Sequence, residues 1–210
     1  QACHHEDILT TRFGFVPVYI NGKSVGIYAY EEHFQKELIE ASKRREGPII
    51  KFSEEDFWFF MRIGFQKGFP YEQSVIEPFS EAKIAEDTVQ FRYFVNAQNL
   101  LQMFRNLDAK ASDIFDVKKM AKFIAFLNSK NSVHALIWHN MRFYYNPVLC
   151  RLEPVVFDMY PGPNEYENNL PIWTFMSGFS LDTRANSFFY LMADTTFKTE
   201  YLRLLDYYTF

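Results

Sequence analysis

Trp138-His139-Asn140-Met141-Arg142-Phe143-Tyr144-Tyr145-Asn146-Pro147, followed by Leu152-Glu153-Pro154-Val155-Val156-Phe157-Asp158, is the stretch that decides the fold. Its two apolar runs, separated by a turn at Asn146-Pro147, predict a β-hairpin. A hairpin returns the chain to its starting point. Asn140 before the first strand and Asp158 after the second are therefore expected to face each other. Sites that hold magnesium for phosphoryl transfer use such a pair of an amide and a carboxylate.

Composition restricts the class of protein. The chain has 210 residues and a mass of 25.0 kDa, which suits one large domain or two small lobes. Hydrophobic residues make up 48% and aromatic residues 19%, so a full core with thick aromatic packing is expected. The net charge is −4, and no basic stripe is interleaved with aromatic residues, which argues against a nucleic-acid partner. Because no apolar run reaches ~18 residues, no transmembrane segment is predicted.

The amino-terminal residues and the cysteines give few functional clues. Cys3 and Cys150 are the only cysteines, and nothing in their spacing argues for a disulfide. The sequence opens without Met, so we expect a fragment of a longer protein, and localisation cannot be read from this end. His4-His5-Glu6-Asp7 has metal-ligating side chains, but adjacent residues rarely converge on one ion, so a frayed or structural segment is expected.

Strand signals dominate the first quarter of the chain and helix signals the rest. Residues 15–30 predict a hairpin around Asn21-Gly22, and 48–52 predict a third strand. Gly26 within the hairpin indicates a bulge or a close backbone approach. Helices are predicted over 34–45, from Ser53 to Gly68, across 80–130, and after a cap at Asp194, whereas 159–186 are predicted to be loop. This order predicts an α+β fold, with one domain over 1–210 that has a strand lobe at about 13–52 and a helical lobe at about 53–210.

Four segments between about residues 13 and 160 occur in the order typical of a known family. They are Pro17-Val18-Tyr19-Ile20-Asn21-Gly22-Lys23 with Gly26-Ile27-Tyr28, Tyr30-Glu31-Glu32-His33-Phe34, Arg44-Arg45-Glu46-Gly47-Pro48-Ile49-Ile50-Lys51-Phe52, and His139-Asn140 with Asn146-Pro147 and Phe157-Asp158. Together they resemble the spore-coat-protein-H (CotH) kinase-like family. The resemblance implies an atypical protein-kinase-like, two-lobed fold that uses ATP with Mg²⁺ or Mn²⁺. It also implies a Ser/Thr substrate in a coat or envelope protein and a place at the bacterial cell surface.

The resemblance assigns the metal to Asp158 and Asn140. A carboxylate that follows an apolar strand is costly to bury unless it is paired or metal-bound. The alternative for Asp158 is an Asx-turn into residues 159–162, which is common at strand ends. For Asn140 the alternative is an amide that satisfies backbone groups at the turn between helix and strand.

The resemblance also assigns residues to the nucleotide. Lys51, in an otherwise apolar strand, would contact the phosphates and pair with Glu32, or next with Glu31. Arg45 would add a further phosphate contact. The alternatives are an edge-strand lysine that faces water and an arginine that completes a solvated helix end.

One position departs from the kinase pattern. Kinase catalytic loops place the catalytic base in Asp-x4-Asn, and counting back from Asn140 gives Ala135. His134 or His139 could serve as the base near neutral pH, although packing against Trp138 is the alternative for both. We therefore expect phosphoryl transfer to be slow or absent.

Two other functions remain open from the sequence. The first is a pseudokinase that keeps the fold and acts as a binding or scaffold module. The second is a cell-surface module that binds carbohydrate or protein through aromatic side chains.

Overall fold

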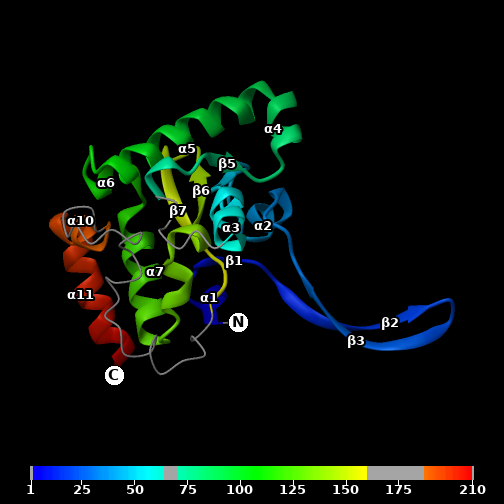
Figure 1. Ribbon diagram of the computed structural model, residues 1–210. Helices are drawn as coiled ribbons and strands as arrows, with labels where there is room; N and C mark the ends of the chain where they lie inside the picture. The colour runs from blue at the N-terminus through cyan, green and yellow to red at the C-terminus, as the bar shows by residue number, and fades with distance from the viewer. Residues whose placement is uncertain (1, 64–70, 160–186, 210) are drawn as a thin grey trace.

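The structure is a computed structural model that describes residues 2–63, 71–159 and 187–209. Its helices and 3-10 turns surround one mixed sheet, which confirms the predicted α+β class (Figure 1). The helices are α1 (Ala2–His5), α2 (Lys36–Ala41), α3 (Glu55–Arg62), α4 (Glu81–Glu86), α5 (Thr88–Asn106), α6 (Ala111–Ile114), α7 (Val117–Ser129), α10 (Ser187–Ala193) and α11 (Thr195–Thr209). The 3-10 turns are η1 (Tyr71–Gln73), η2 (Val133–Leu136) and η3 (Trp138–Asn140).

A five-stranded sheet forms the centre of the molecule, with the strand order β1-β7-β6-β4-β5. Its strands are β1 (Leu9–Thr10), β4 (Ile49–Phe52), β5 (Ile76–Pro78), β6 (Arg142–Asn146) and β7 (Arg151–Val156). The β6–β7 pair is the predicted hairpin, and β1 alone runs parallel to its neighbour, β7. The expected strand at 48–52 is also present, and it pairs with β6 so that Lys51 lies beside Arg142.

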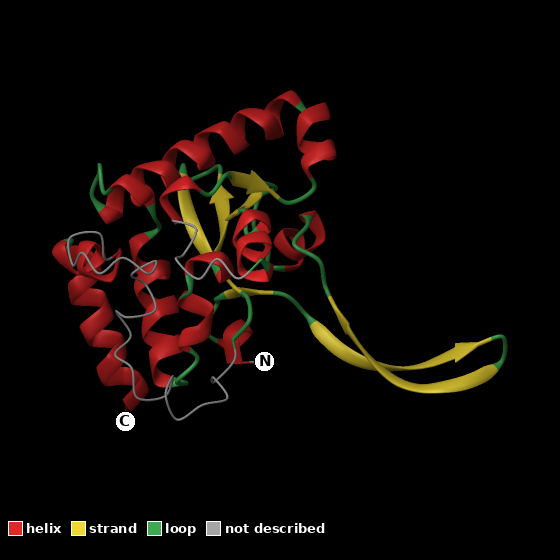
Figure 2. Ribbon diagram, viewed as in Figure 1, coloured by secondary structure: helices red, strands yellow, loops and turns green. Residues whose placement is uncertain are grey.

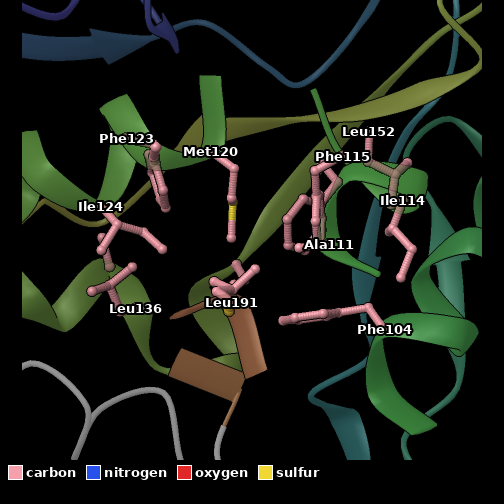
Figure 3. Close-up of a cluster of buried hydrophobic side chains, with 14 of the residues drawn as sticks. Phe104, Ala111, Ile114, Phe115, Met120, Phe123, Ile124, Leu136, Leu152 and Leu191 are labelled. Carbon is pink, nitrogen blue, oxygen red and sulfur yellow. The ribbon is translucent and has the colours of Figure 1, made fainter. Parts of the chain in front are cut away.

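The two faces of the sheet bury different sets of side chains, because successive residues of a strand point to opposite faces. One face packs against α5, α6 and α7. The helix α11 packs in turn on α7, with α10 against α11, and these helices and this face together form the main core. Figure 3 shows part of that core, to which Phe104, Phe115, Met120 and Leu191 contribute together with Leu152 of β7. The other face carries Ile49, Tyr144 and Val155, which pack with Leu38 and Ile39 of α2. By the same alternation along the strands, the side chains of Lys51, Arg142 and Glu153 also point to this second face.

Aspartate side chains cap the amino-terminal ends of the three longest helices that the structure describes, α5, α7 and α11. Asp87 accepts hydrogen bonds from the backbone of Val89 and Gln90 at the start of α5. Asp116 does the same for Lys119 N in α7. Asp194 accepts from Thr196 N at 2.9 Å and Phe197 N at 3.2 Å in α11, which confirms the predicted cap.

The predicted hairpin at 15–30 is present as β2 (Phe13–Ile20) and β3 (Lys23–Glu31), but it does not join the central sheet. Asn21 and Gly22 both have positive φ, at 50° and 78°, as a tight hairpin turn requires. The register shifts after Val18, and Gly26 has φ 106°, so the predicted bulge is also present. The hairpin extends away from the rest of the molecule as a two-stranded arm (Figures 1 and 2).

The strand lobe expected over 13–52 therefore does not form as one unit, and the structure does not confirm a two-lobed arrangement. The reason is the pairing of β4, which hydrogen-bonds to β6 and β5 rather than to the arm. The strands of the arm pair with each other in a separate two-stranded sheet.

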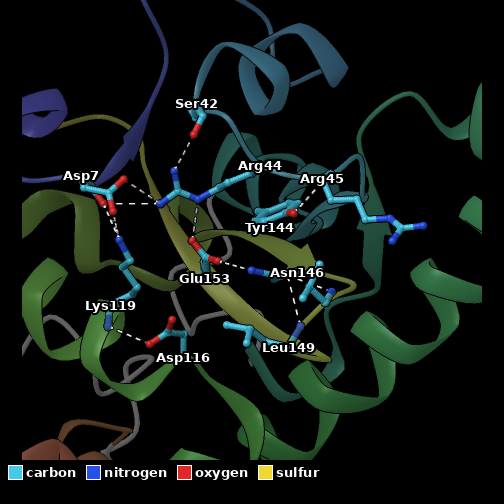
Figure 4. Close-up of polar contacts among 11 residues, drawn as sticks. Asp7, Ser42, Arg44, Arg45, Asp116, Lys119, Tyr144, Asn146, Leu149 and Glu153 are labelled. Carbon is cyan, nitrogen blue, oxygen red and sulfur yellow. Dashed lines mark hydrogen bonds and ion pairs between the residues drawn. The ribbon is translucent and has the colours of Figure 1, made fainter.

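Charged side chains attach the amino-terminal segment to the core (Figure 4). Arg44, three residues after the end of α2, contacts the buried Glu153 of β7 at 2.8 Å and Asp7 at 3.2 Å. Asp7 also pairs with Lys119 of α7, and Glu6 accepts a hydrogen bond from Tyr208 at 2.8 Å. The Glu6-Asp7 pair thus has the structural role expected for this segment. Cys3 and Cys150 are free, as the sequence predicts.

Candidate functional site

The end of the β6–β7 hairpin brings together the residues that the sequence singled out. Asn140 ends η3, just before β6, and Asp158 follows β7 by two residues. Asn140 Nδ2 lies 3.4 Å from Asp158 Oδ2 and donates to the His134 carbonyl at 3.1 Å. The backbone of Asp158 has φ 50°, a left-handed conformation that aspartate tolerates better than most residues. The hairpin geometry thus places the amide and the carboxylate side by side, as its two ends predict.

His134 also belongs to this cluster. Its Nε2 lies 3.1 Å from Asp158 Oδ2, and its side chain is about one-quarter exposed at 26%. The 3-10 turn η2 projects this ring toward the carboxylate. Packing in the aromatic core was the alternative for both histidines, and His139 takes that place, between the rings of Trp138 and Trp58.

The cluster suits a divalent cation that keeps much of its water. Both hydrogen bonds described for the Asn140 side chain come from Nδ2, so its Oδ1 is the oxygen available to an ion. Within residues 2–63, 71–159 and 187–209, no three His, Cys, Asp or Glu side chains gather into a metal-holding group. Magnesium often binds through one or two protein oxygens together with substrate phosphates and waters. Asp158 and Asn140 fit that manner of binding.

A row of charged side chains continues from this cluster across the second face of the sheet. Arg142 is buried, and its Nη2 lies 3.6 Å from Glu54 Oε1. Its guanidinium also lies 4.6 Å from the centre of the Phe157 ring, next to Asp158 in the chain. Lys51, the neighbour of Arg142 on β4, pairs with Glu77 Oε1 at 3.1 Å. Two cations therefore lie beside each other on the face that leads to Asp158.

Burial decides the charge states of two members of this region. It lowers the pKa of His139 to about 4, so this ring is neutral at pH 7 and is a weak base. Burial also lowers the pKa of Arg142 to about 10, and nearby Glu54 and Asp158 offset part of that effect. Arg142 stays charged at pH 7. Of the two histidines, His134 is the better candidate for a proton acceptor because it is accessible and touches Asp158.

A cavity of about 760 Å³ opens between the end of β7 and the base of the arm. Phe157, Asp158 and Met159 line one side, and Phe13 and Tyr30 line the other. Pockets for small molecules typically have ~300–1,000 Å³, so a nucleotide fits this volume. The base of the arm and the β6–β7 hairpin thus share a cavity even though the rest of the arm extends away.

The residues assigned to the nucleotide are placed less uniformly. Lys51 pairs with Glu77 of β5, whereas Glu32 pairs with Arg12, whose Nε donates to Glu32 Oε2 at 2.9 Å. The expected Lys51–Glu32 pair is thus not the one that the structure contains. The physical reason is the sheet order, since β5 lies beside β4, whereas Glu32 directly follows β3 of the arm, which is not part of the central sheet.

Arg45 lies toward the other end of the sheet. Arg45 is exposed, and its carbonyl accepts a hydrogen bond from the Tyr144 hydroxyl (Figure 4). Tyr144 lies on β6 two residues beyond Arg142, farther from Asp158 along the strand. The structure therefore does not bring Arg45 to Asp158. Its neighbour Arg44 is committed to Glu153 and Asp7.

Ala135 points into the protein rather than into the site. It is 1% exposed and belongs to the main hydrophobic cluster. A carboxylate at this position would be buried among apolar side chains, at a cost of several kcal/mol unless paired. The departure from Asp-x4-Asn is therefore built into the local packing, and restoring a base at position 135 alone would disrupt the core.

Arg142, Glu54 and Glu77 are site residues that the sequence prediction missed. One signal was present, because Arg142 stands in the apolar run Met141–Tyr145, where a buried charge needs a partner. Glu77 gave no signal, since its strand has only three residues and ends in proline.

The combination of an α+β fold with a carboxylate and an amide at a sheet end is compatible with a kinase-like domain. A family model described as CotH kinase protein matches residues 4–208, which is nearly the whole chain. The protein therefore belongs to the CotH kinase family. No curated protein matches the sequence. In the part of the chain that the structure describes, no helix is both long and apolar enough to cross a membrane.

Proposed function

We propose that this chain binds ATP together with Mg²⁺ or Mn²⁺ and transfers the γ-phosphoryl group to a Ser or Thr hydroxyl of a protein. From the family resemblance, we infer that this substrate is a coat or envelope protein. One observation carries the proposal: Asp158 Oδ2 lies 3.4 Å from Asn140 Nδ2 and 3.1 Å from His134 Nε2, beside a cavity of about 760 Å³.

Each residue of the site has a distinct role in this proposal. Asp158 and the Oδ1 atom of Asn140 would hold the divalent ion, which when bound neutralises charge on the phosphates. Lys51 and Arg142 supply positive charge from the same face of the sheet. Glu77 fixes Lys51 in place of the expected Glu32. His134 would accept the proton of the attacking hydroxyl, which is a role for an accessible imidazole near neutral pH.

A second candidate function is a pseudokinase that binds nucleotide without transferring phosphate. The observation that favours it is Ala135, which stands where the family pattern expects the base and is buried in the core. A well-placed general base typically accelerates a proton-transfer-dependent reaction by ~10²–10⁴-fold, so its loss would slow phosphoryl transfer. The loose transition state of phosphoryl transfer depends more on metal and positioning than on the base. Nucleotide binding is therefore common to both candidates.

Binding is tested first, by melting the protein with and without ATP and Mg²⁺. We expect the nucleotide with metal to raise the melting temperature, and Asp158→Asn to abolish that rise while barely changing the metal-free value. Glu37→Gln, which removes the same charge from an exposed position on α2, is the matched control and should keep the rise. If Asp158→Asn retains the full shift, the metal site is wrong.

Transfer is tested next, with ATP labelled at the γ-phosphate and a Ser/Thr-containing acceptor protein. Slow incorporation that falls further in His134→Asn supports phosphoryl transfer with His134 as the base. Binding without any incorporation supports the pseudokinase. Strong incorporation that survives both His134→Ala and His139→Ala would refute the assignment of a histidine base.

A further inference from the structure

The arm formed by β2 and β3 exposes an apolar surface that its own fold does not cover. Nine large hydrophobic side chains between Phe13 and Tyr30 are from 40% to 75% exposed. They are Phe13, Phe15, Val16, Tyr19, Ile20, Val25, Ile27, Tyr28 and Tyr30. Lys23 is the one charged residue in 13–30. An isolated two-stranded hairpin is marginally stable in water, so we expect the arm to be stabilised by binding a partner.

The two free edges of the ribbon are not equivalent. Proline has no N–H group, and a strand tolerates it where its nitrogen faces away from the neighbouring strand. Pro17 therefore leaves the free edge of β2 without a donor near its middle. Its cross-strand partner is Ile27, which accordingly turns its own N–H and C=O toward the free edge of β3. The edge of β3, which has no proline, is the one able to pair with another strand.

The sequence of β3, Lys-Ser-Val-Gly-Ile-Tyr-Ala-Tyr-Glu, is complementary to itself when it is reversed. In an antiparallel pairing centred on Ile27, Lys23 of one copy faces Glu31 of the other, and this happens at both ends. Gly26 faces Tyr28, whose ring can cover the glycine. The space beside Gly26 is open, with no atom within 4 Å of a Cβ built there. The register shift between Val18 and Tyr19 adds one residue to β3 between Ile27 and Lys23, so Lys23 comes level with Tyr30, one position short of Glu31. Its long side chain must reach along the strand end to that carboxylate.

From these observations we propose that the arm pairs with the arm of a second copy of this chain, β3 against β3, through a two-fold axis at Ile27. The product is a four-stranded antiparallel sheet with a β2 strand at each outer edge. Opposite charges meet at each end of the new pair, and no like charges do. Pro17 then blocks further strand addition at both outer edges, so assembly stops at a dimer instead of forming a fibre.

The position of the arm permits this pairing. The arm points away from the central sheet and the helices (Figure 2). Because a nine-residue strand extends ~30 Å, the two bodies of the dimer lie at opposite ends of the shared sheet. The tip of each arm then reaches the base of the other, where Glu31 accepts a hydrogen bond from Thr11 at 2.7 Å. Glu31 lines the cavity that holds Asp158. Each copy thus contributes the Lys23 end of its arm to the mouth of the other copy's cavity.

A lipid surface is a poorer fit for the same ribbon. Within hydrocarbon every backbone N–H and C=O must be satisfied, and a two-stranded hairpin leaves both outer edges unpaired. Pairing with a second copy satisfies the β3 edges, and it keeps the β2 edges in water.

The dimer is tested by sedimentation velocity on the full chain, at protein concentrations from a few micromolar to several hundred micromolar. We expect a reversible monomer–dimer equilibrium with a dissociation constant on the order of micromolar, as for small interfaces. Lys23→Glu should weaken it roughly tenfold or more, because two attractive charge pairs become repulsive. Glu31→Lys should do the same, and the double variant Lys23→Glu/Glu31→Lys should restore dimerisation. Lys83→Glu, the same charge change on the exposed face of α4, should have no effect.

A cross-linking experiment fixes the register. In a Cys150→Ser background, Ile27→Cys should form an intermolecular disulfide on oxidation, because the two copies meet at this residue, with Cα atoms ~5.5 Å apart. Phe15→Cys, equally exposed but on the other strand, should not. A chain that stays monomeric at all concentrations overturns the proposal, as does failure of the double variant to recover or equal cross-linking at both positions. A monomer that sediments with neutral lipid vesicles would assign the ribbon to a membrane instead.

Discussion

Arg44→Met is expected to destabilise the fold strongly, because Arg44 neutralises a buried carboxylate. The side chain of Glu153 is 4% exposed and that of Arg44 is 12% exposed, and their Nε and Oε2 atoms lie 2.8 Å apart (Figure 4). Without Arg44, Glu153 keeps only the hydrogen bond from Asn146 Nδ2 at 2.7 Å among its described side-chain contacts. Removing one partner of a buried pair costs ~3–5 kcal/mol, and the remaining amide bond places this case near the lower end.

Substitutions of Glu153, alone and combined with Arg44→Met, test the expected loss of unfolding free energy more sharply. Glu153→Gln should cost less, about 1–2 kcal/mol, because Arg44 keeps Asp7 and the Ser42 carbonyl. The double variant Arg44→Met/Glu153→Leu buries no unpaired charge, so it should lie within about 1 kcal/mol of the wild type. Urea unfolding at pH 7 gives these values. At ~2–4 °C per kcal/mol, the melting temperature of Arg44→Met should fall by roughly 6–12 °C.

A loss below about 1 kcal/mol at pH 7, or a double variant as unstable as Arg44→Met, would refute the argument that this charge pair is a buried one.

Three further predictions concern single positions. His139 has a folded pKa of about 4, below its unfolded value of 6.5, so the unfolded chain takes up the proton first. The unfolding free energy should then fall by roughly 3 kcal/mol as the pH drops from 6.5 to 4 in metal-free buffer, and His139→Gln should flatten that part of the profile. Gly47→Ala should be strongly destabilising in thermal melts and should weaken exchange protection of β4, since its Cβ would lie 2.3 Å from the Tyr145 carbonyl oxygen. An unchanged melting temperature would contradict this close packing. Asp194→Ala should cost ~1–2 kcal/mol in urea unfolding through loss of the α11 cap, and Asp194→Asn less, whereas equal losses would argue against capping.

Much of the fold follows from local sequence. The Asn21-Gly22 turn, the bulge at Gly26 and the caps at Asp116 and Asp194 are properties of a few neighbouring residues, and the structure has all of them. The approach of Asn140 and Asp158 was predictable for the same reason, since one hairpin joins them. The predicted loop at 159–186 lies almost wholly outside the described residues, as do the residues after 63 in the predicted helix from Ser53.

The arrangement of the strands could not be predicted locally. The arm has apolar residues on both faces, a pattern that favours burial in a sheet, and yet the structure exposes every residue of β3. The partner of Lys51 depended on which strand lies beside β4, and Glu77 stands in a strand too short to give a periodic signal. The direction in which Ala135 points depended on the packing of η2 against the main core. These are long-range choices that single segments do not encode.

The claim that Asp158 and Asn140 form a metal–nucleotide site is tested most directly by electron paramagnetic resonance of Mn²⁺ with a non-hydrolysable ATP analogue. The signal of free Mn²⁺ is compared between the analogue alone and the analogue together with the protein. The further loss of that signal when the protein is present gives the amount of Mn²⁺ bound at the protein site. We predict one protein-bound metal–nucleotide complex per chain in the wild type. Asp158→Asn should lose it, Asn140→Ala should weaken it, and Glu37→Gln should retain it. Binding of the same strength in Asp158→Asn would contradict the account.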